Sequence, residues 1–190
     1  MVAFPVLLDS CVLYPMYLRD TLLCAAEAGL YQVRWTDEIL AGAFRNLVKD
    51  GRINKIQADR LNQVMNQAFP EALIKMTDDL LPCMDNDEGD RHVVAAALVG
   101  KAEVIVTDNL KHFPRQSLEK FNVIAQSADD FLLSLLDLFD AQLMSVLATQ
   151  VGRTQTPKLS INDLLELLQN SVPQFSVACL ERIPNQSKQG

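Results

Sequence analysis

Several classes of protein are excluded by what the 190-residue chain lacks. It has two histidines and four cysteines, none of them in a CxxC pair, so zinc fingers and a disulfide framework are not expected. There is no run of about 18 uncharged apolar residues and no basic region at the N-terminus, which argues against a membrane span and a signal peptide. The motifs GxGxxG, GxxxxGK[ST] and GxSxG are also missing. We therefore expect a globular cytoplasmic protein.

Positively charged residues are fewer than negatively charged ones: 17 lysines and arginines against 24 aspartates and glutamates give a formal net charge of -7. A protein that coats nucleic acid or a membrane surface would be basic overall, so this balance argues against both. It leaves room for an enzyme that meets nucleic acid through a local patch and metal ions. Two basic runs, at residues 44–60 and 111–120, are candidates for phosphate contacts, and ordinary solvated helix surfaces are the alternative.

The first two thirds of the chain alternate between short apolar runs and amphipathic segments. Strands are predicted at residues 2–8, 31–35, 103–107 and 122–125, and helices at 18–30, 53–69 and 92–99, with a further helix capped by Thr36. Strands that alternate with helices form a parallel sheet whose two faces are covered by helices. The predicted fold class is therefore α/β, with a central parallel sheet between two helical layers.

From Ser127 onward the pattern is helical and rich in leucine. A linker is predicted at residues 152–157, and a helix that starts at Ser160 is expected to break at residues 171–173. We expect an α/β domain at residues 1–126 and a C-terminal helical extension at 127–190 packed on it, with a partner-binding hairpin as the alternative. The extension carries more apolar surface than a small sheet needs, so part of it is expected to form a protein interface.

Three aspartates are expected at one edge of the sheet. Asp9 follows the first predicted strand, Asp108 follows the third, and Asp90 begins the helix between them. Taken singly, each is typical of a turn or a helix cap. Taken together, they repel one another unless a cation binds them, and oxygen ligands favour Mg²⁺ or Mn²⁺ over zinc. Such a cluster favours metal-dependent hydrolysis of a phosphodiester.

Four segments, LLDSCVLYP, RWTDEIL, GDRHVVAAAL and VIVTDNLKHFP, resemble the PIN-domain family over residues 6–130. The chain is most similar to the longer VapC-like bacterial toxin ribonucleases. The resemblance implies a PIN-like three-layer fold and an Mg²⁺- or Mn²⁺-dependent endoribonuclease that hydrolyses RNA with metal-activated water. It also implies an antitoxin protein as partner and, often, a homodimer, with no membrane involved.

The resemblance assigns roles to individual residues. Asp9, Asp90 and Asp108 are the implied metal ligands, and Thr107 and Asn109 complete the catalytic set. Asn109 occupies the usual family position and Asp108 is an extra acid beside it, so either one is a candidate for the residue that faces the metal. Four cationic residues are candidates for substrate binding: Arg45, Lys49, Arg91 and Lys111.

One position departs from the family pattern. The family has a glutamate about six residues after the hydroxyl residue that caps this helix, and counting from Thr36 places Gly42 there. Glu38, one helical turn earlier, is an imperfect substitute. A catalytically impaired PIN fold that binds RNA or protein is therefore the alternative function, and an unrelated phosphate-binding α/β domain is a third hypothesis.

Overall fold

A four-stranded parallel sheet forms the centre of the protein. The computed structural model describes residues 4–76, 78–154 and 156–183. Strands β1 (Pro5–Leu8), β2 (Gln32–Arg34), β3 (Val104–Val106) and β4 (Ile124–Gln126) lie in the order β2-β1-β3-β4. The central strand β1 is buried on both faces, which explains its continuous apolar run. The predicted sheet is confirmed, although residues 2 and 3 of the first predicted strand lie outside the described residues.

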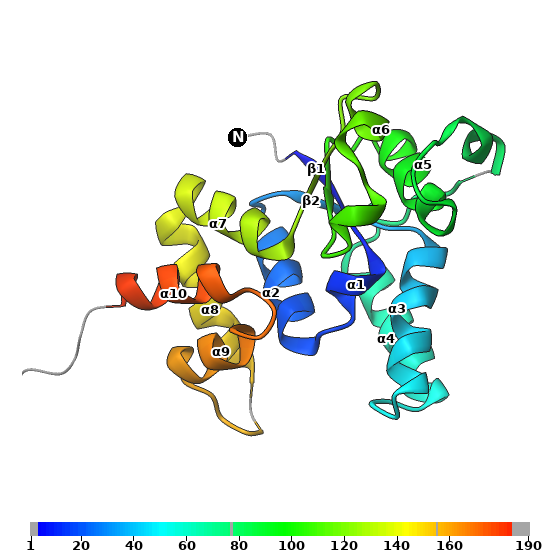
Figure 1. Ribbon diagram of the computed structural model, residues 1–190. Coiled ribbons are helices and arrows are strands. Elements are labelled where there is room, and N and C mark those ends of the chain that lie inside the picture. The colour runs from blue at the N-terminus through cyan, green and yellow to red at the C-terminus, as the bar shows by residue number, and fades with distance from the viewer. Residues whose placement is uncertain (1–3, 77, 155, 184–190) are drawn as a thin grey trace, which may run out of the picture.

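Helices cover both faces of this sheet and make three layers (Figure 1). Helix α2 (Met16–Glu27) lies on one face, and α5 (Arg91–Val99) and α6 (Arg115–Glu119) lie on the other, while α3 (Asp37–Lys49) and α4 (Lys55–Ala68) form a hairpin at the lower right of the view. The chain crosses from β1 to β2 in one direction and from β2 to β3 in the other. Because parallel crossovers are right-handed, the connecting helices fall on opposite faces.

The ends of two predicted helices follow from local chemistry. The Thr36 hydroxyl accepts a hydrogen bond from the Ile39 amide at 3.2 Å, as expected of the residue that caps α3. Helix α2 ends where Gly29 adopts φ +77°, a conformation that glycine reaches without strain. Several short elements were not predicted: helices α1 (Ser10–Leu13) and α6, and the 3₁₀ turns η1 (Asp78–Cys83), η2 (Glu88–Asp90) and η3 (Leu110–His112).

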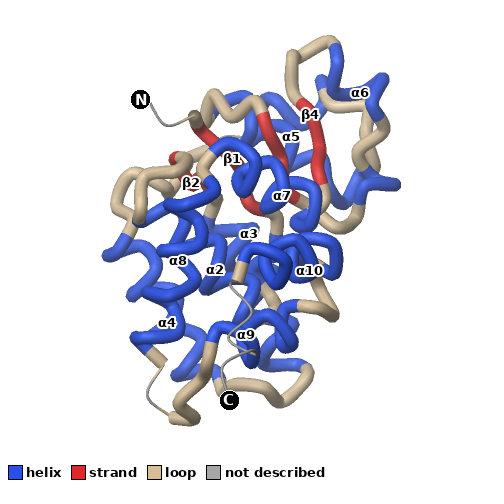
Figure 2. The backbone as a smooth tube through the Cα atoms, turned by 90° about the vertical axis from the view of Figure 1, so that its left-hand side faces the viewer, coloured by secondary structure: helices blue, strands red, loops and turns tan. Residues whose placement is uncertain are grey.

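Four helices follow the sheet and pack on the side of α2 (Figure 2). They are α7 (Ala128–Leu138), α8 (Asp140–Arg153), α9 (Ile161–Leu168) and α10 (Pro173–Arg182). Helix α9 ends at Leu168, ahead of the break expected at residues 171–173, and Pro173 then starts α10, where its missing N–H costs nothing. Within the described ranges no single helix meets the length and hydropathy of a membrane span; α7 and α8 meet them only jointly, bent by 119°.

Buried polar contacts join these helices to the sheet domain and to one another. The Thr21 hydroxyl on α2 donates to Gln150 Oε1 on α8 at 2.9 Å, and Gln150 Nε2 donates to the Tyr17 carbonyl at 3.2 Å. The carboxylate of Asp129 on α7 accepts from the Gln174 and Phe175 amides at 3.1 and 2.8 Å. These side chains are 1% (Gln150) and 8% (Asp129) exposed, so each bond is shielded from water.

Candidate active site

The carboxylate of Asp9 sits where β1 and β3 end. The Asp9 amide donates to the Val106 carbonyl at 3.0 Å, which holds the two strand ends side by side. Asp9 Oδ1 accepts from the Ser10 amide at 2.6 Å, and Oδ2 accepts from the Thr107 hydroxyl at 2.7 Å. Asp9 is 4% exposed, so it is rigidly placed. Among the described residues, Oδ1 accepts only the hydrogen bond from Ser10, so it still has a lone pair available for a further ligand.

Cys11 lies beside this pair. Its Sγ is 3.4 Å from both Asp9 Oδ2 and Thr107 Oγ1, and it accepts from the Asp108 amide at 3.3 Å. Burial, with the nearby charge of Asp9, raises the pKa of the Cys11 thiol to about 12. The thiol therefore stays protonated at neutral pH, and a thiolate nucleophile is not available here.

Asp90 is joined to Asp9 through two intermediate residues. It precedes α5, yet its side chain makes no capping bond; Oδ2 lies 3.3 Å from Asn109 Nδ2 instead. The Asn109 amide donates to the Thr107 hydroxyl at 3.1 Å. A continuous hydrogen-bonded chain thus runs from Asp9 through Thr107 and Asn109 to Asp90. The interpretation of Asp90 as an ordinary helix cap does not account for this geometry.

Asp108 and Asn109 point to different partners. Asp108 Oδ1 accepts from the amide of Ala128, the first residue of α7, at 3.0 Å. The side chain of Asn109 faces Asp90, as described above. Of the two residues that the sequence left open, Asn109 is thus the one in hydrogen-bond contact with another predicted site residue, while Asp108 ties β3 to the start of α7.

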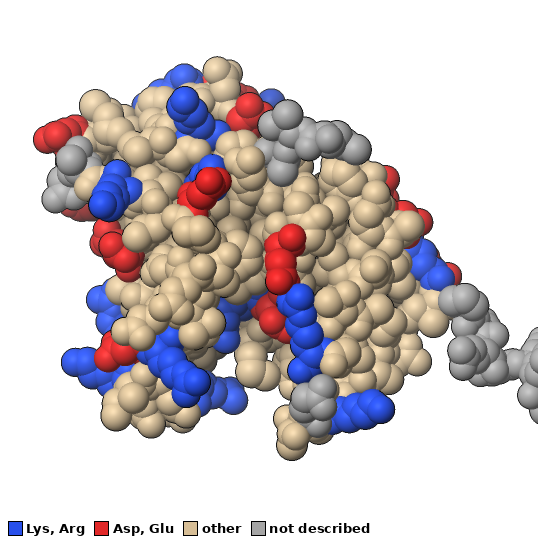
Figure 3. Space-filling model, turned by 180° about the vertical axis from the view of Figure 1, so that it is seen from behind, with Lys and Arg blue, Asp and Glu red and all other residues tan. Residues whose placement is uncertain are grey.

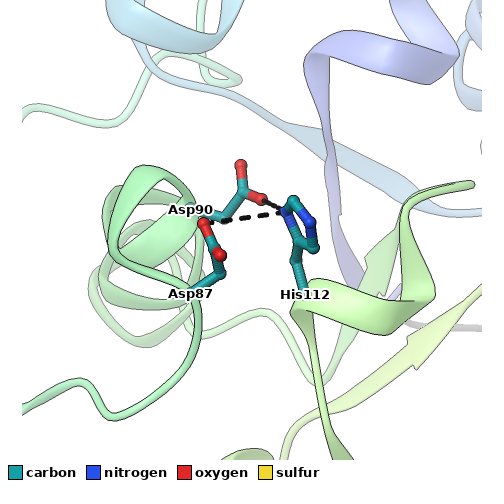
Figure 4. Close-up of side chains that lie close together, drawn as sticks. All are labelled: Asp87, Asp90 and His112. Carbon is teal, nitrogen blue, oxygen red and sulfur yellow. Dashed lines mark hydrogen bonds and ion pairs between the residues drawn. The ribbon is translucent and has the colours of Figure 1, made fainter.

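His112 is a site residue that sequence reasoning missed. Its Nδ1 lies 2.6 Å from Asp90 Oδ2, 2.7 Å from Asn109 Nδ2 and 3.7 Å from Asp87 Oδ1 (Figure 4). In the sequence, His112 stands out only as part of the basic run at residues 111–120. Its position three residues after Asn109 is one turn of the 3₁₀ helix η3, which sets the two side chains on one side.

Gly42 faces the same edge from α3. A Cβ atom at this position would lie 3.4 Å from Ser10 Cβ and 3.7 Å from Ser10 Oγ. Ser10 directly follows Asp9, so a longer side chain at position 42 would start next to the predicted metal ligand. Glu38 is exposed and lies one turn earlier on the same helix. A carboxylate side chain at position 42 would therefore start beside Ser10, next to Asp9.

The candidate substrate-binding cations surround the edge at different depths. Arg45 and Lys49 are exposed and follow Gly42 along one face of α3. Lys111 is exposed in η3, and Arg91 is half-buried at the start of α5. Figure 3 shows lysine and arginine gathered at the lower left, over the α3–α4 hairpin. A positive surface thus leads away from the acidic strand ends along α3.

The donor set at this edge fits a divalent cation. The ligand atoms of Asp87, Asp90 and His112 lie within 4.8 Å of one another, and Asp9 is linked to them through Thr107 and Asn109. Carboxylate oxygens are the ligands that Mg²⁺ and Mn²⁺ take in proteins. Two carboxylates from the η2 segment and one imidazole from η3 thus lie close enough together to share a divalent ion.

Comparisons with known proteins agree with this arrangement. A family model described as "PIN domain" matches residues 5–111, more than half of the chain, and one described as "VapC50 C-terminal domain" matches residues 128–181. The protein named "Putative ribonuclease VapC50" from Mycobacterium tuberculosis is 41% identical over 113 residues, which are 60% of this chain and 67% of that protein. No solved structure matches. The resemblance seen in the sequence is therefore confirmed, and this chain belongs to the PIN-domain family.

Proposed function

We propose that this protein is a metal-dependent endoribonuclease, the toxin of a VapC-type toxin–antitoxin pair. The observation that carries the proposal is the chain from Asp9 through Thr107 and Asn109 to Asp90 at the strand ends. The relative from M. tuberculosis, named as a ribonuclease, supports RNA as the substrate. The fold and the acidic edge together favour hydrolysis of a phosphodiester over binding alone.

Asp9 and Asp90 are the proposed ligands of Mg²⁺ or Mn²⁺, with Asn109 better placed than Asp108 to join them. A bound divalent cation neutralises phosphate charge and lowers the pKa of water. Thr107 holds the Asp9 carboxylate in place, and Asn109 does the same for Asp90. Asp108 is proposed to hold the start of α7, which would explain its bond to Ala128.

The RNA backbone is proposed to follow the positive surface of α3. Arg45 and Lys49 are exposed on the helix that carries Gly42, so they can contact phosphates on one side of the cleavage point. Lys111 and Arg91 are proposed to do so on the other side, because they flank His112 and Asp90 in sequence. These contacts neutralise phosphates and position the strand without reading bases.

The remaining proposals concern organisation and partners. We place the domain boundary at residues 126–127, between β4 and α7. An antitoxin protein is the proposed partner, and part of the apolar surface of the C-terminal helices is its proposed contact, with a homodimer as a further assembly. Action in the cytoplasm follows from an RNA substrate.

Purified protein incubated with single-stranded RNA tests the proposal. We expect cleavage with Mg²⁺ or Mn²⁺, none with EDTA, and none in Asp9→Asn under the same conditions. Cleavage by the purified protein that persists in EDTA and in Asp9→Asn would rule out the metal mechanism, because it would depend neither on the ion nor on its proposed ligand.

A second function is favoured by Gly42, whose missing side chain faces Ser10 at the acidic edge. With one carboxylate fewer than the family pattern, the protein would bind a cation weakly and act as an RNA- or protein-binding PIN fold. Repulsion between the remaining carboxylates would also be lower, so the fold is stable without the ion.

Gly42→Glu separates the two functions, with Gly42→Gln as the control of equal size and no charge. We expect Glu, but not Gln, to tighten Mn²⁺ binding and to raise RNA cleavage. If the glutamate variant binds metal no better while the starting protein cleaves RNA well, position 42 is not the missing acid. Glu38 or another carboxylate then completes the site.

A further inference from the structure

We propose that His112 supplies a nitrogen ligand to the cation site, together with Asp87 and Asp90, and that this ligand makes the site prefer Mn²⁺ to Mg²⁺. The inference rests on the proposed function, because it adds a ligand to the same cation. It gives His112 and Asp87, which the acidic family pattern does not use, a direct part in choosing the metal.

The first argument is the convergence of lone pairs. His112 Nδ1 and Asp90 Oδ2 are 2.6 Å apart, and Asp87 Oδ1 is 3.7 Å from the same nitrogen (Figure 4). When the imidazole is neutral with its proton on Nε2, Nδ1 and both carboxylates are acceptors. Acceptors at this separation repel unless a proton or a cation lies between them.

The second argument is that the backbone holds His112 against the loop that carries both aspartates. The His112 carbonyl accepts from the Asp87 amide and from Asn86 Nδ2, each at 3.4 Å. The His112 amide donates to the Asn109 carbonyl at 3.0 Å. The side chains of His112, Asp90 and Asp87 are 31%, 21% and 46% exposed, so an ion can reach them from solvent. The ligands are preorganised by the backbone and open on one side.

The third argument is the chemistry of the donors. Mg²⁺ takes oxygen ligands and keeps several of its waters, whereas imidazole suits first-row transition ions. A set of two carboxylates and one imidazole therefore adds affinity for Mn²⁺ that Mg²⁺ does not share. Co²⁺ binds nitrogen more strongly than Mn²⁺ does. We therefore expect the affinity of the site to be weakest for Mg²⁺, higher for Mn²⁺ and highest for Co²⁺.

Metal titrations of the full chain test the selectivity. His112→Ala is compared with the starting protein and with His92→Ala, which removes the chain's other histidine. We expect His112→Ala to lose about 10- to 100-fold in Mn²⁺ affinity and less than about threefold in Mg²⁺ affinity, with His92→Ala changing neither. Equal losses for the two ions would overturn the proposal, because His112 would then only hold Asp90 in place. The same titrations on Gly42→Glu cover the case in which the starting protein binds too weakly to measure.

A second measurement uses the starting protein and therefore does not require that His112→Ala folds. The two imidazoles are followed by nitrogen NMR while Zn²⁺ is added. We expect the Nδ1 resonance of His112 to shift and the resonances of His92 to stay in place. A His112 resonance that stays in place while the protein binds the ion overturns the inference, even if RNA is cleaved. Conversely, a shifted resonance in a protein that never cleaves RNA supports the metal site and contradicts the nuclease proposal alone.

Discussion

Two regions of the protein each contain a buried aspartate: the sheet edge where the strands end, and the contact between α7 and α10, which we call the seam. The two carboxylates have different hydrogen-bond partners. At the seam, both oxygens of Asp129 accept backbone amides at the start of α10. At the edge, Asp9 accepts one amide and one hydroxyl, and the hydrogen-bonded chain continues to Asp90. Asp9 and Asp129 are 4% and 8% exposed, so burial alone does not separate them.

The difference between them lies in what compensates the charge. Two amides at the positive end of α10 stabilise the Asp129 carboxylate, which makes it part of the fold. Asp9 instead lies at an edge to which Asp90 and Asp87 add further negative charge, and that charge is useful only when a cation binds. Asp9 also caps a helix, through the Ser10 amide of α1, so what distinguishes it from Asp129 is its hydrogen-bonded link to a second carboxylate.

The largest effect is expected from Asp9→Asn, which removes a proposed metal ligand. RNA cleavage in Mn²⁺ should fall by about 100-fold or more, since the loss removes charge that acts on the transition state. The melting temperature without metal should change by less than about 3 °C, because an acceptor oxygen is kept for the Ser10 amide. A large drop in melting temperature would mean that Asp9, like Asp129, is mainly structural.

Asp129→Asn should show the opposite pattern. The amide keeps one acceptor but presents N–H donors to the Gln174 or Phe175 amide, which costs about 2–3 kcal/mol of the free energy of unfolding. For a chain of this length the melting temperature should then fall by about 5–10 °C. Calorimetry measures the loss of stability. In a Mn²⁺ titration, folded Asp129→Asn should bind the ion with the same affinity as the starting protein. Weaker Mn²⁺ binding would contradict the separation of the two regions.

Thr107→Val falls between these two variants, because the Thr107 hydroxyl serves both the fold and the edge. It removes the donor to Asp9 and the acceptor of the Asn109 amide. We expect a loss of about 1–2 kcal/mol in stability and about tenfold in Mn²⁺ affinity. Thr107→Ser keeps the hydroxyl and should restore most of both. A serine variant as weak as the valine variant would show that the hydroxyl is not sufficient, because serine keeps the hydroxyl and lacks the methyl group.

The smallest effect is expected from Asp108→Ala. This removes one bond to the Ala128 amide and should cost about 0.5–1 kcal/mol, with Mn²⁺ affinity unchanged. The substitution Asn109→Ala at the next residue should, in contrast, lower the Mn²⁺ affinity. The reverse order in a titration of the two variants would show that Asp108 is the residue that faces the metal.

Much of this fold could be predicted from local patterns. Strands β1 and β3 are short apolar runs, and the Thr36 cap and the stop at Gly29 follow from backbone chemistry. Helix α10 was missed, because Pro173 is compatible both with the end of a helix and with the first turn of the next one. The short helix α1 and the 3₁₀ turns were missed because so few residues show no periodicity.

The sequence by itself determined which residues reach the sheet edge. Parallel strands end on one side, so Asp9 and the Thr107–Asn109 segment had to meet, and Asp90 was expected there from the helix that it begins. Only the tertiary structure decided where each side chain points. It directed Asp108 to the start of α7, turned Asn109 and His112 to Asp90, and set Gly42 against Ser10. These choices depend on contacts between segments far apart in the chain, and residue spacing alone carries no information about them.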